Sequence, residues 1–191
     1  MKTKITVIGL AAIALLMSAC SSQPKVEKLS DRQACVIEGK KAPNWVCNQD
    51  IGYPDQLKDI GVAPYRSQGE FAFARREAMA NGRSNLAQQI QTDVKDKVAT
   101  FMEKTGLGEA STIDKVTTQV SKQVAKVSLT NSHQLEFWDS GKSLFLLVGI
   151  PKKNVNEAVK SSTKTSFKNE NALWQQFKAK NAMKELDKEF K

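Results

Sequence analysis

Apolar or small residues recur at every fourth position over a long stretch of the chain, from about residue 68 to 104. The row is Ala74, Ala78, Gly82, Leu86, Ile90, Val94, Val98 and Met102. A step of four keeps side chains near one face of an α-helix, so the pattern predicts a long helix. Asn81-Gly82 is also a turn signal, but the period continues across it and favours an unbroken helix. The small first half predicts close backbone packing.

The residues that follow predict a second helix and then a strand pair. Gly106-Leu107-Gly108 ends the first helix, and Ser111 or Thr112 can cap the next one, whose apolar row is Ile113, Val116, Val120, Val124 and Val127. From about Lys126 to Trp138 the pattern alternates, which predicts a strand. Residues 139–142 form a turn, and the nearly unbroken apolar run 144–150 predicts a central strand. A short first strand is expected around residues 60–63.

The C-terminal part is expected to be more polar. Pro151 ends the strand and begins a short helix to about Lys160, residues 161–166 are a polar linker, and residues 171–191 are helical. One side of this tail carries Leu173, Phe177, Met183, Leu186 and Phe190, surrounded by five lysines. The fold class is therefore α+β, with a small antiparallel sheet packed by a long Ala-rich helix and a second helix, and with a C-terminal helical tail.

The N-terminus has the layout of an export signal, predicted to span residues 1–19. Lys2 and Lys4 precede an uncharged stretch over residues 5–17, which is too short to span a bilayer because that needs about 20 apolar residues. Met17-Ser18-Ala19-Cys20 resembles the bacterial lipobox. The resemblance implies that Cys20 becomes the first residue and carries diacylglyceryl and N-acyl groups. An ordinary secretory signal with a chance cysteine is the alternative.

Three acyl chains would anchor the protein to a membrane, whereas one chain binds only marginally. The aspartate that retains lipoproteins at the inner membrane is absent, because position 21 is serine. The resemblance therefore implies an outer-membrane protein facing the periplasm, with exposure on the cell surface left open. No other segment is long and apolar enough to span a membrane.

The export signal and the hydrophobic pattern together divide the sequence into four parts. They are the signal peptide 1–19, a flexible tether 20–33, an α+β domain 34–160, and a polar linker with a basic C-terminal helix 161–191. Cys35 and Cys47 are an even pair in an oxidising compartment, which predicts a disulfide worth about 3 kcal/mol in the chain-entropy model. Free thiols or a metal pair are the alternatives. A metal site needs further ligands, and the single histidine, His133, is distant in sequence.

The chain carries a formal charge of +9. This charge either makes the surface soluble or suits an anionic neighbour, such as phospholipid, lipopolysaccharide, peptidoglycan or an acidic protein. Nucleic acid is not an expected partner of an exported protein. Arg75, Arg76 and Arg83 are expected to form solvated pairs with Glu70 and Glu77, and Arg75 and Arg83 can also meet acidic groups on a neighbouring subunit.

The sequence offers no constellation for catalysis, so we expect neither enzyme activity, nor a metal, nor a cofactor beyond the covalent lipid. His133 is expected to be a solvated strand residue. Glu136 and Asp139 are expected on opposite faces of their strand, so the sequence does not support a paired acid and base. Trp45, Trp138 and Trp174 are expected to pack in the core or at an interface, with exposed binding anchors as the alternative.

Several of these features, in this order, resemble the LPP-twenty type of bacterial lipoprotein. They are the lipobox 17–20, Pro43-Asn44-Trp45-Val46, the strand 60–63, the Ala-rich helix 74–87, and Trp138 followed by the aliphatic run 144–150. The resemblance implies a helix laid over an antiparallel sheet, an outer-membrane location and no known catalysis. Some relatives resemble flagellar lipoproteins that assemble into rings around the motor.

Two functions remain as hypotheses. The first is a structural or interaction lipoprotein that self-associates or binds envelope proteins. Its candidate contacts are the small stripe Ala74, Ala78 and Gly82 and the terminal pair Leu186 and Phe190. The second is a binding module for an anionic envelope polymer, peptidoglycan or lipopolysaccharide, carried by the lysine-rich tail over residues 169–191.

Overall fold

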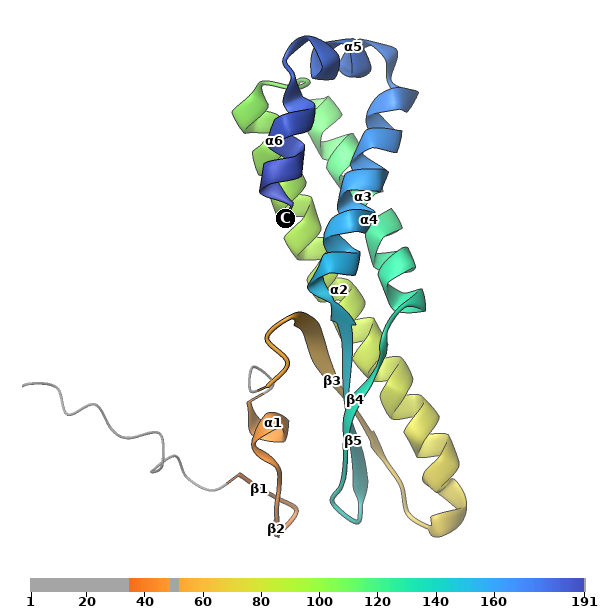
Figure 1. The fold of residues 1–191 in the computed structure, drawn as a ribbon. Coiled ribbons are helices and arrows are strands. Elements are labelled where there is room, and N and C mark those ends of the chain that lie inside the picture. Colours follow the sequence, from red (N-terminus) through yellow and green to blue (C-terminus); the bar gives the residue numbers. More distant parts are fainter. Residues whose placement is uncertain (1–34, 49–51, 191) are drawn as a thin grey trace, which may run out of the picture. The chain divides into compact units, whose positions relative to one another are not determined.

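The computed structural model describes residues 35–48 and 52–190, which fall within one unit, Ala34–Lys191. The predicted signal peptide, Cys20 and the tether lie outside the described residues. The elements are β1 (Val36–Ile37), β2 (Lys40–Lys41), α1 (Asn44–Cys47), β3 (Gln56–Pro64), η2 (Gln68–Glu70), α2 (Phe71–Thr105), α3 (Ala110–Thr130), β4 (His133–Asp139), β5 (Ser143–Pro151), α4 (Lys152–Asn169), α5 (Asn171–Ala179) and α6 (Ala182–Glu189). Figure 1 shows their arrangement, and the α+β class is confirmed.

The main sheet has the order β3-β5-β4 and is antiparallel, so the prediction of a central apolar strand is confirmed. One face of β5, with Leu144, Leu146, Val148 and Ile150, belongs to the same core as α2. The other face packs Phe145 and Leu147 against Trp45 of the disulfide segment, residues 35–47. Both faces of β5 are therefore covered, which explains why its sequence is a continuous apolar run and does not alternate.

The disulfide segment is fastened to the sheet at two places. The structure joins Cys35 and Cys47 in a disulfide with a Cα–Cα distance of 5.9 Å, as the sequence predicts. The Glu38 carboxylate accepts hydrogen bonds from the Ser140 and Ser143 hydroxyls beside the β4–β5 turn. Trp45 is 9% exposed and packs as expected. The disulfide segment therefore covers the face of the sheet that carries Phe145 and Leu147.

Removing the disulfide is expected to loosen this segment without unfolding the sheet. Cys35→Ser with Cys47→Ser should lower the free energy of unfolding by about 2–3 kcal/mol, because the loop regains freedom in the unfolded chain. Urea denaturation measures the loss, and an increase in Trp45 exposure should show in tryptophan fluorescence quenching. An unchanged midpoint with the disulfide intact in the parent protein would contradict this account.

The first half of α2 lies very close to β3. A Cβ atom on Gly61 would lie 1.8 Å from the Ala78 carbonyl oxygen and 2.3 Å from the Gly82 nitrogen. Ala74 and Ala78 are fully buried, and Gly82 is buried as well. The prediction of close backbone packing is thus confirmed. The stripe Ala74, Ala78, Gly82 is nevertheless not a self-association site, because its partner is a strand of the same chain.

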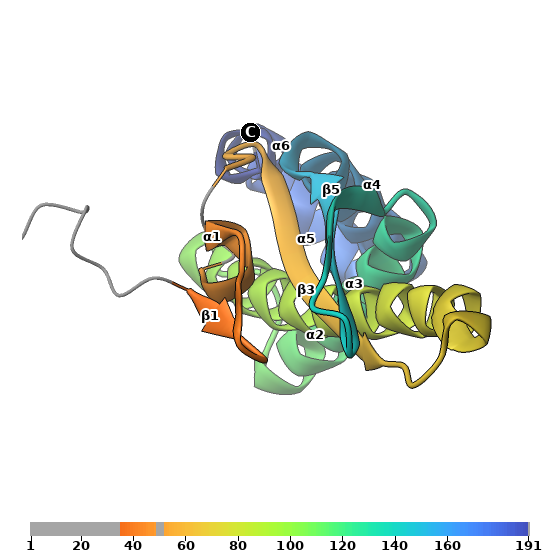
Figure 2. The same cartoon turned by 90° about the horizontal axis from the view of Figure 1, so that it is seen from below.

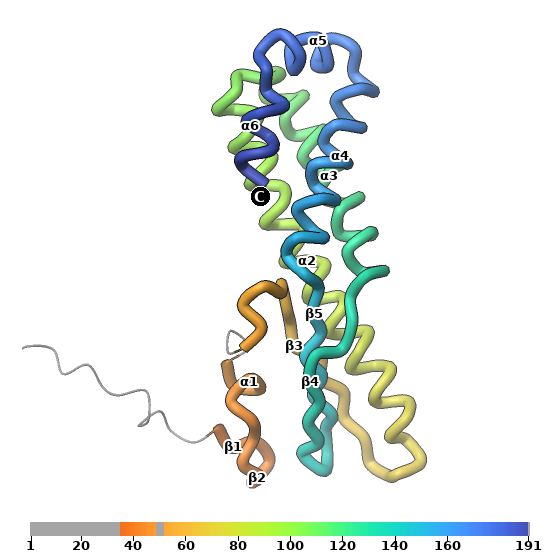
Figure 3. Tube along the Cα trace, in the orientation of Figure 1, coloured from red at the N-terminus to blue at the C-terminus, as the bar shows by residue number. Residues whose placement is uncertain are grey.

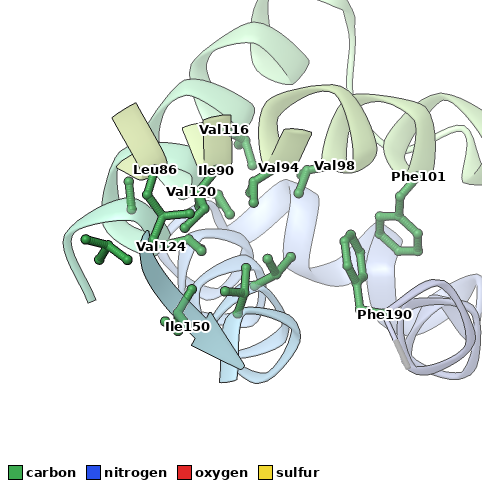
Figure 4. Packing of buried hydrophobic residues seen from close by; sticks show 14 of the residues in the cluster. Leu86, Ile90, Val94, Val98, Phe101, Val116, Val120, Val124, Ile150 and Phe190 are labelled. Carbon is green, nitrogen blue, oxygen red and sulfur yellow. The ribbon is translucent and has the colours of Figure 1, made fainter. Parts of the chain in front are cut away.

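The second half of α2 packs with the later helices beyond one end of the sheet (Figures 1 and 2). Figure 4 shows the cluster, in which Leu86, Ile90, Val94 and Val98 of α2 meet Val116, Val120 and Val124 of α3. Phe190 lies in the same core and is 2% exposed, and Leu186 is fully buried. The proposed terminal contact pair is therefore also wrong as a self-association site, since the tail folds back on its own chain.

Two predicted boundaries are wrong. β5 leads directly into α4, which runs to Asn169, so the expected linker at residues 161–166 is helical (Figure 3). The strand expected from Lys126 begins only at His133, because α3 continues to Thr130. Val127 and Leu129 imitate alternation, but the buried residues Val124 and Ser128 keep the helical step of four. The predicted cap of α3 is also wrong. The N-cap residue is Glu109, which makes no side-chain hydrogen bond there, so neither Ser111 nor Thr112 caps the helix.

Lys180 connects the C-terminal helices to the end of α2. Gly106 ends α2 in the left-handed conformation, at φ 61°, as the sequence predicts. The Lys180 ammonium then donates to the carbonyl oxygens of Gly106, at 2.6 Å, and Thr105, at 3.1 Å. A cation at this position satisfies terminal carbonyls and complements the helix dipole. The tail is thus positioned by polar contacts as well as by its buried face.

Candidate interaction surface

The two edges of the main sheet differ in how their backbone groups are satisfied. At the β3 edge, the Asn81 and Asn85 side chains of α2 donate to the carbonyl oxygens of Val62, at 2.9 Å, and Ile60, at 3.0 Å. The Ile60 N–H donates to the Asp59 carboxylate at 2.7 Å, and burial raises the pKa of that carboxyl. The middle of this edge is therefore covered by side chains of α2 and by Asp59, and covering an edge is a common protection against pairing with other chains.

The β4 edge is open. Within residues 35–48 and 52–190, β4 pairs only with β5, and no hydrogen bond outside that ladder reaches its backbone. Every residue of β4 is exposed or half-buried. An unpaired strand edge of this kind is a template for pairing with another chain.

A β-bulge decides which β4 side chains face α2. The register shifts between Gln134 and Glu136, and Leu135 packs in the cluster on the Trp45 side of the sheet. Gln134 and Phe137, three residues apart, both contact Arg75: its Nη2 donates to the Gln134 side-chain oxygen at 3.1 Å, and its guanidinium carbon lies 6.0 Å from the Phe137 ring centroid. Simple alternation would place those two side chains on opposite faces, so the bulge creates this arrangement.

A groove of about 450 Å³ runs between α2 and β4. It is lined by Arg75, Arg76, Met79, Ala80 and Arg83 of α2, Gln134 of β4 and Leu146 of β5. Arg83 is fixed by Ser132, whose hydroxyl accepts from Nε at 3.1 Å and whose carbonyl accepts from Nη2 at 3.2 Å. The lining contains three guanidinium groups and no carboxylate, so the groove is strongly positive.

The expected pairs between these arginines and Glu70 or Glu77 are not formed in the described part of the chain. The Glu70 carboxylate accepts from the Arg66 backbone N–H at 2.7 Å. Arg75 and Arg83 are held by uncharged partners, and Arg76 has no hydrogen bond or ion pair with any described residue. The positive charge of the groove is therefore not neutralised by neighbouring carboxylates.

Aromatic rings stand on the two elements that form the groove, Phe71 and Phe73 on α2 and Phe137 on β4. Phe71 packs edge-on against Tyr65 and Phe137, with centroid distances of 5.8 Å and 6.1 Å. Phe73 is 62% exposed and Phe137 is 39% exposed. Arginine, methionine and aromatic residues are the types enriched at protein interfaces. We call the groove together with Phe71, Phe73 and Phe137 the α2–β4 surface.

Sequence reasoning identified only part of this surface. It singled out the three arginines but assigned them to local ion pairs, and it did not identify Phe73, Phe137 or Gln134. The available signal for Phe73 was that it lies outside the row of Ala74 and Ala78 and three residues before Arg76, a spacing that makes the two residues neighbours on a helix. No pattern in the sequence shows the bulge that turns Gln134 and Phe137 toward α2.

The other sequence-predicted polar residues do not converge. His133 is exposed in β4, as expected. Glu136 accepts from the Tyr53 hydroxyl at 2.6 Å and Asp139 from the Tyr65 hydroxyl at 2.9 Å, so the two carboxylates have separate partners. These hydrogen bonds raise the pKa of both tyrosines. Residues 35–48 and 52–190 contain no group of three potential metal ligands.

A second hollow, of about 330 Å³, shows a weaker preference for any class of ligand. It lies between α2 and α4, with Val94, Val155 and Val159 among its lining residues. Asp93 opposes the charges of Lys97 and Lys152 in its lining, so its preference for an anion is weaker than that of the groove with three arginines and no carboxylate. The α2–β4 surface is the better candidate because its exposure, composition and charge all favour a partner.

The region of the chain that builds this surface also carries its family relationship. The LPP20 lipoprotein family model, the type described above as LPP-twenty, matches residues 43–151, from the start of α1 to the end of β5. No curated protein matches the chain at a significant level of similarity. None of the helices in residues 35–48 and 52–190 combines the length and apolarity that crossing a membrane requires. With more than half of its length matched, the chain belongs to the LPP20 lipoprotein family.

Proposed function

We propose that this protein is a non-catalytic lipoprotein of the outer membrane, held by acyl groups on Cys20, whose folded part binds envelope proteins on the periplasmic side. The observation that carries the binding role is the α2–β4 surface, where three arginines line a groove without a carboxylate partner among the described residues. On the same helix, Phe73 is 62% exposed. Membership in a lipoprotein family supports the anchor. A flagellar assembly or an array of further copies is one setting in which such an anchored binding module would act.

The absence of catalysis is part of the proposal. Glu136 and Asp139 are bound to different tyrosines, and His133 lies on an exposed strand without a carboxylate to orient it among the described residues. General acid–base chemistry needs groups within hydrogen-bond reach of one substrate. These residues therefore support binding without turnover.

The anchor is tested at Cys20 and Ser21. The native protein should carry three acyl chains at its N-terminus, measured by mass spectrometry, and should fractionate with the outer membrane. Cys20→Ser should abolish acylation, and Ser21→Asp should shift the protein to the inner membrane while Ser21→Asn leaves it in place. An unmodified N-terminus in the native protein would end the proposal. Loss of motility or of envelope integrity on deletion would then distinguish a flagellar from a general role.

An anionic envelope polymer is the second candidate, favoured by the +9 charge and the exposed lysines Lys178 and Lys184. Truncating the tail is not a suitable test, because Leu173 and Phe177 are buried. Lys178→Glu with Lys184→Glu should instead abolish salt-sensitive sedimentation with peptidoglycan. Unchanged sedimentation would exclude the tail as the binding element.

A further inference from the structure

We propose that the α2–β4 surface binds an extended, acidic segment of a partner protein, which adds a fourth strand to the open edge of β4 and pairs its carboxylates with Arg75, Arg76 and Arg83. This inference rests on the proposed function, because it names the class of partner that the anchored module would hold. It requires an available edge, a matching spacing and a complementary charge.

The edge is available where the opposite edge is not. Two asparagines of α2 and Asp59 occupy the Ile60 N–H and the carbonyl oxygens of Ile60 and Val62 in β3. Among the described residues, no such contact reaches the backbone of β4. After the bulge, residues 136–139 continue in regular register with β5. An added strand would therefore find a regular, unpaired ladder beside the groove, and main-chain hydrogen bonds would supply affinity independent of side chains.

The geometry of the groove sets the spacing of the partner. α2 and β4 run alongside each other in opposite directions, since Phe71 contacts Phe137 at one end and Arg83 contacts Ser132 at the other. Arg75 and Arg83 are eight residues apart on α2, or about 12 Å at 1.5 Å per residue. Residues i and i+4 of a strand are about 13 Å apart on one face. The partner should therefore carry acidic residues at i and i+4.

The residue between them should be apolar. Met79 lies midway between Arg75 and Arg83 along α2 and, with Ala80 and Leu146, lines the apolar part of the groove. Position i+2 of an added strand would meet this part. The recognised pattern is thus acidic-x-apolar-x-acidic, with the x side chains on the opposite face.

The arginines are oriented but not saturated. Arg75 uses Nη2 toward Gln134, and Arg83 uses Nε and Nη2 toward Ser132, so each retains free N–H donors. A guanidinium held in place loses little conformational entropy on binding a carboxylate. A second copy of this chain fits less well, because both partners would be strongly basic.

The test uses the full acylated protein in detergent and the fluorescently labelled peptide acetyl-Ser-Glu-Val-Leu-Thr-Glu-Val-amide. This peptide has glutamates at i and i+4 and leucine between them. We expect saturable binding that weakens at least about tenfold when both glutamates become glutamine. The loss of a single charge-assisted hydrogen bond already lowers affinity by about tenfold. N-methylation of alternate backbone nitrogens on the ladder side should abolish binding, and the peptide should protect the amides of residues 136–139 from hydrogen exchange.

Matched protein variants separate the groove from general charge. Arg75→Gln with Arg76→Gln should weaken peptide binding about tenfold or more. Of the single variants, Arg76→Gln should weaken it, whereas Arg66→Gln, which removes the same one charge outside the groove, should not. Arg76→Gln is the cleanest of these variants, because the Arg76 side chain makes no hydrogen bond or ion pair with any described residue. Equal binding of the N-methylated peptide, or equal loss with Arg66→Gln, would show a diffuse electrostatic patch that suits a polyanion and would overturn the proposal.

The same experiment distinguishes failure of the inference from failure of the proposed function. If no acidic peptide binds although Cys20-dependent crosslinking still captures envelope proteins from whole cells, strand addition is wrong and the anchored binding role stands. If the protein carries no acyl chain, the proposed function fails first, and peptide binding in vitro would no longer describe an anchored module.

Discussion

Replacing Gly61 with alanine is expected to destabilise the protein by more than about 4 kcal/mol, or to prevent folding altogether. The added Cβ would lie 1.8 Å from the Ala78 carbonyl oxygen and 2.3 Å from the Gly82 nitrogen. These are backbone atoms of a continuous helix, so they cannot move aside by a change of rotamer. α2 would have to separate from the sheet along its buried first half. Urea denaturation followed by circular dichroism measures the loss.

Two other glycines calibrate this result. Gly69→Ala should be neutral or slightly stabilising, because its Cβ would lie 3.8 Å from the nearest atom, Ser67 Oγ, and the unfolded chain loses freedom. Gly82→Ala should cost less than Gly61→Ala, since its closest neighbour is a side-chain methyl of Val148, at 2.7 Å. A Gly61→Ala protein as stable as the Gly69→Ala control would mean that α2 does not lie this close to β3.

The close packing was predictable, but its partner was not. A row of Ala and Gly indicates that some backbone comes near the helix, without saying whether it belongs to the same chain. The sequence interpretation assigned it to another copy, whereas Gly61 of β3 fills that place. Glycine inside a strand is itself a sign of close backbone approach. If Gly61 and Gly82 had been interpreted as two sides of one close contact, the sequence would have predicted that the helix packs on a strand of its own chain.

The α2–β4 surface was less accessible to sequence reasoning than the core. The core follows from periodicity, because its residues repeat every fourth position in α2 and continuously in β5. The surface depends on the bulge between Gln134 and Glu136, which changes the face to which later β4 residues point. A one-residue shift reverses every side chain after it, so a strand assigned from about Lys126 could not place Phe137 correctly.

For residues 161–166, the amino-acid composition predicts a linker whereas the spacing of the buried positions predicts a helix. Its serines, threonines and lysine are typical of a linker, but Val155, Val159, Thr163 and Phe167 continue a step of four and are buried. Small hydroxyl side chains fit at a helix interface even though they suggest a loop by composition. The period was the better guide, because burial of one helical face outweighs the weak helix propensity of Ser and Thr.

Replacing Phe177 with alanine is expected to lower the free energy of unfolding by about 3–5 kcal/mol, the usual cost of deleting a buried phenyl ring. Phe177 is 1% exposed, and its ring centroid lies 5.1 Å from that of Phe167 and 5.4 Å from that of Trp174. The measurement is chemical denaturation of the full chain. Lys184→Ala, at an exposed position of α6, should change stability by less than about 0.5 kcal/mol.

This second result would decide whether the C-terminal helices are an appendage or part of the core. α4, α5 and α6 follow the segment matched by the family model, residues 43–151, yet Phe167, Phe177 and Leu186 are buried in the same cluster as Val98 of α2. If they belong to one cooperative unit, Phe177→Ala should lower a single unfolding transition that also reports on the sheet. A separate early transition, or no change, would mean that the matched region folds without its C-terminal helices.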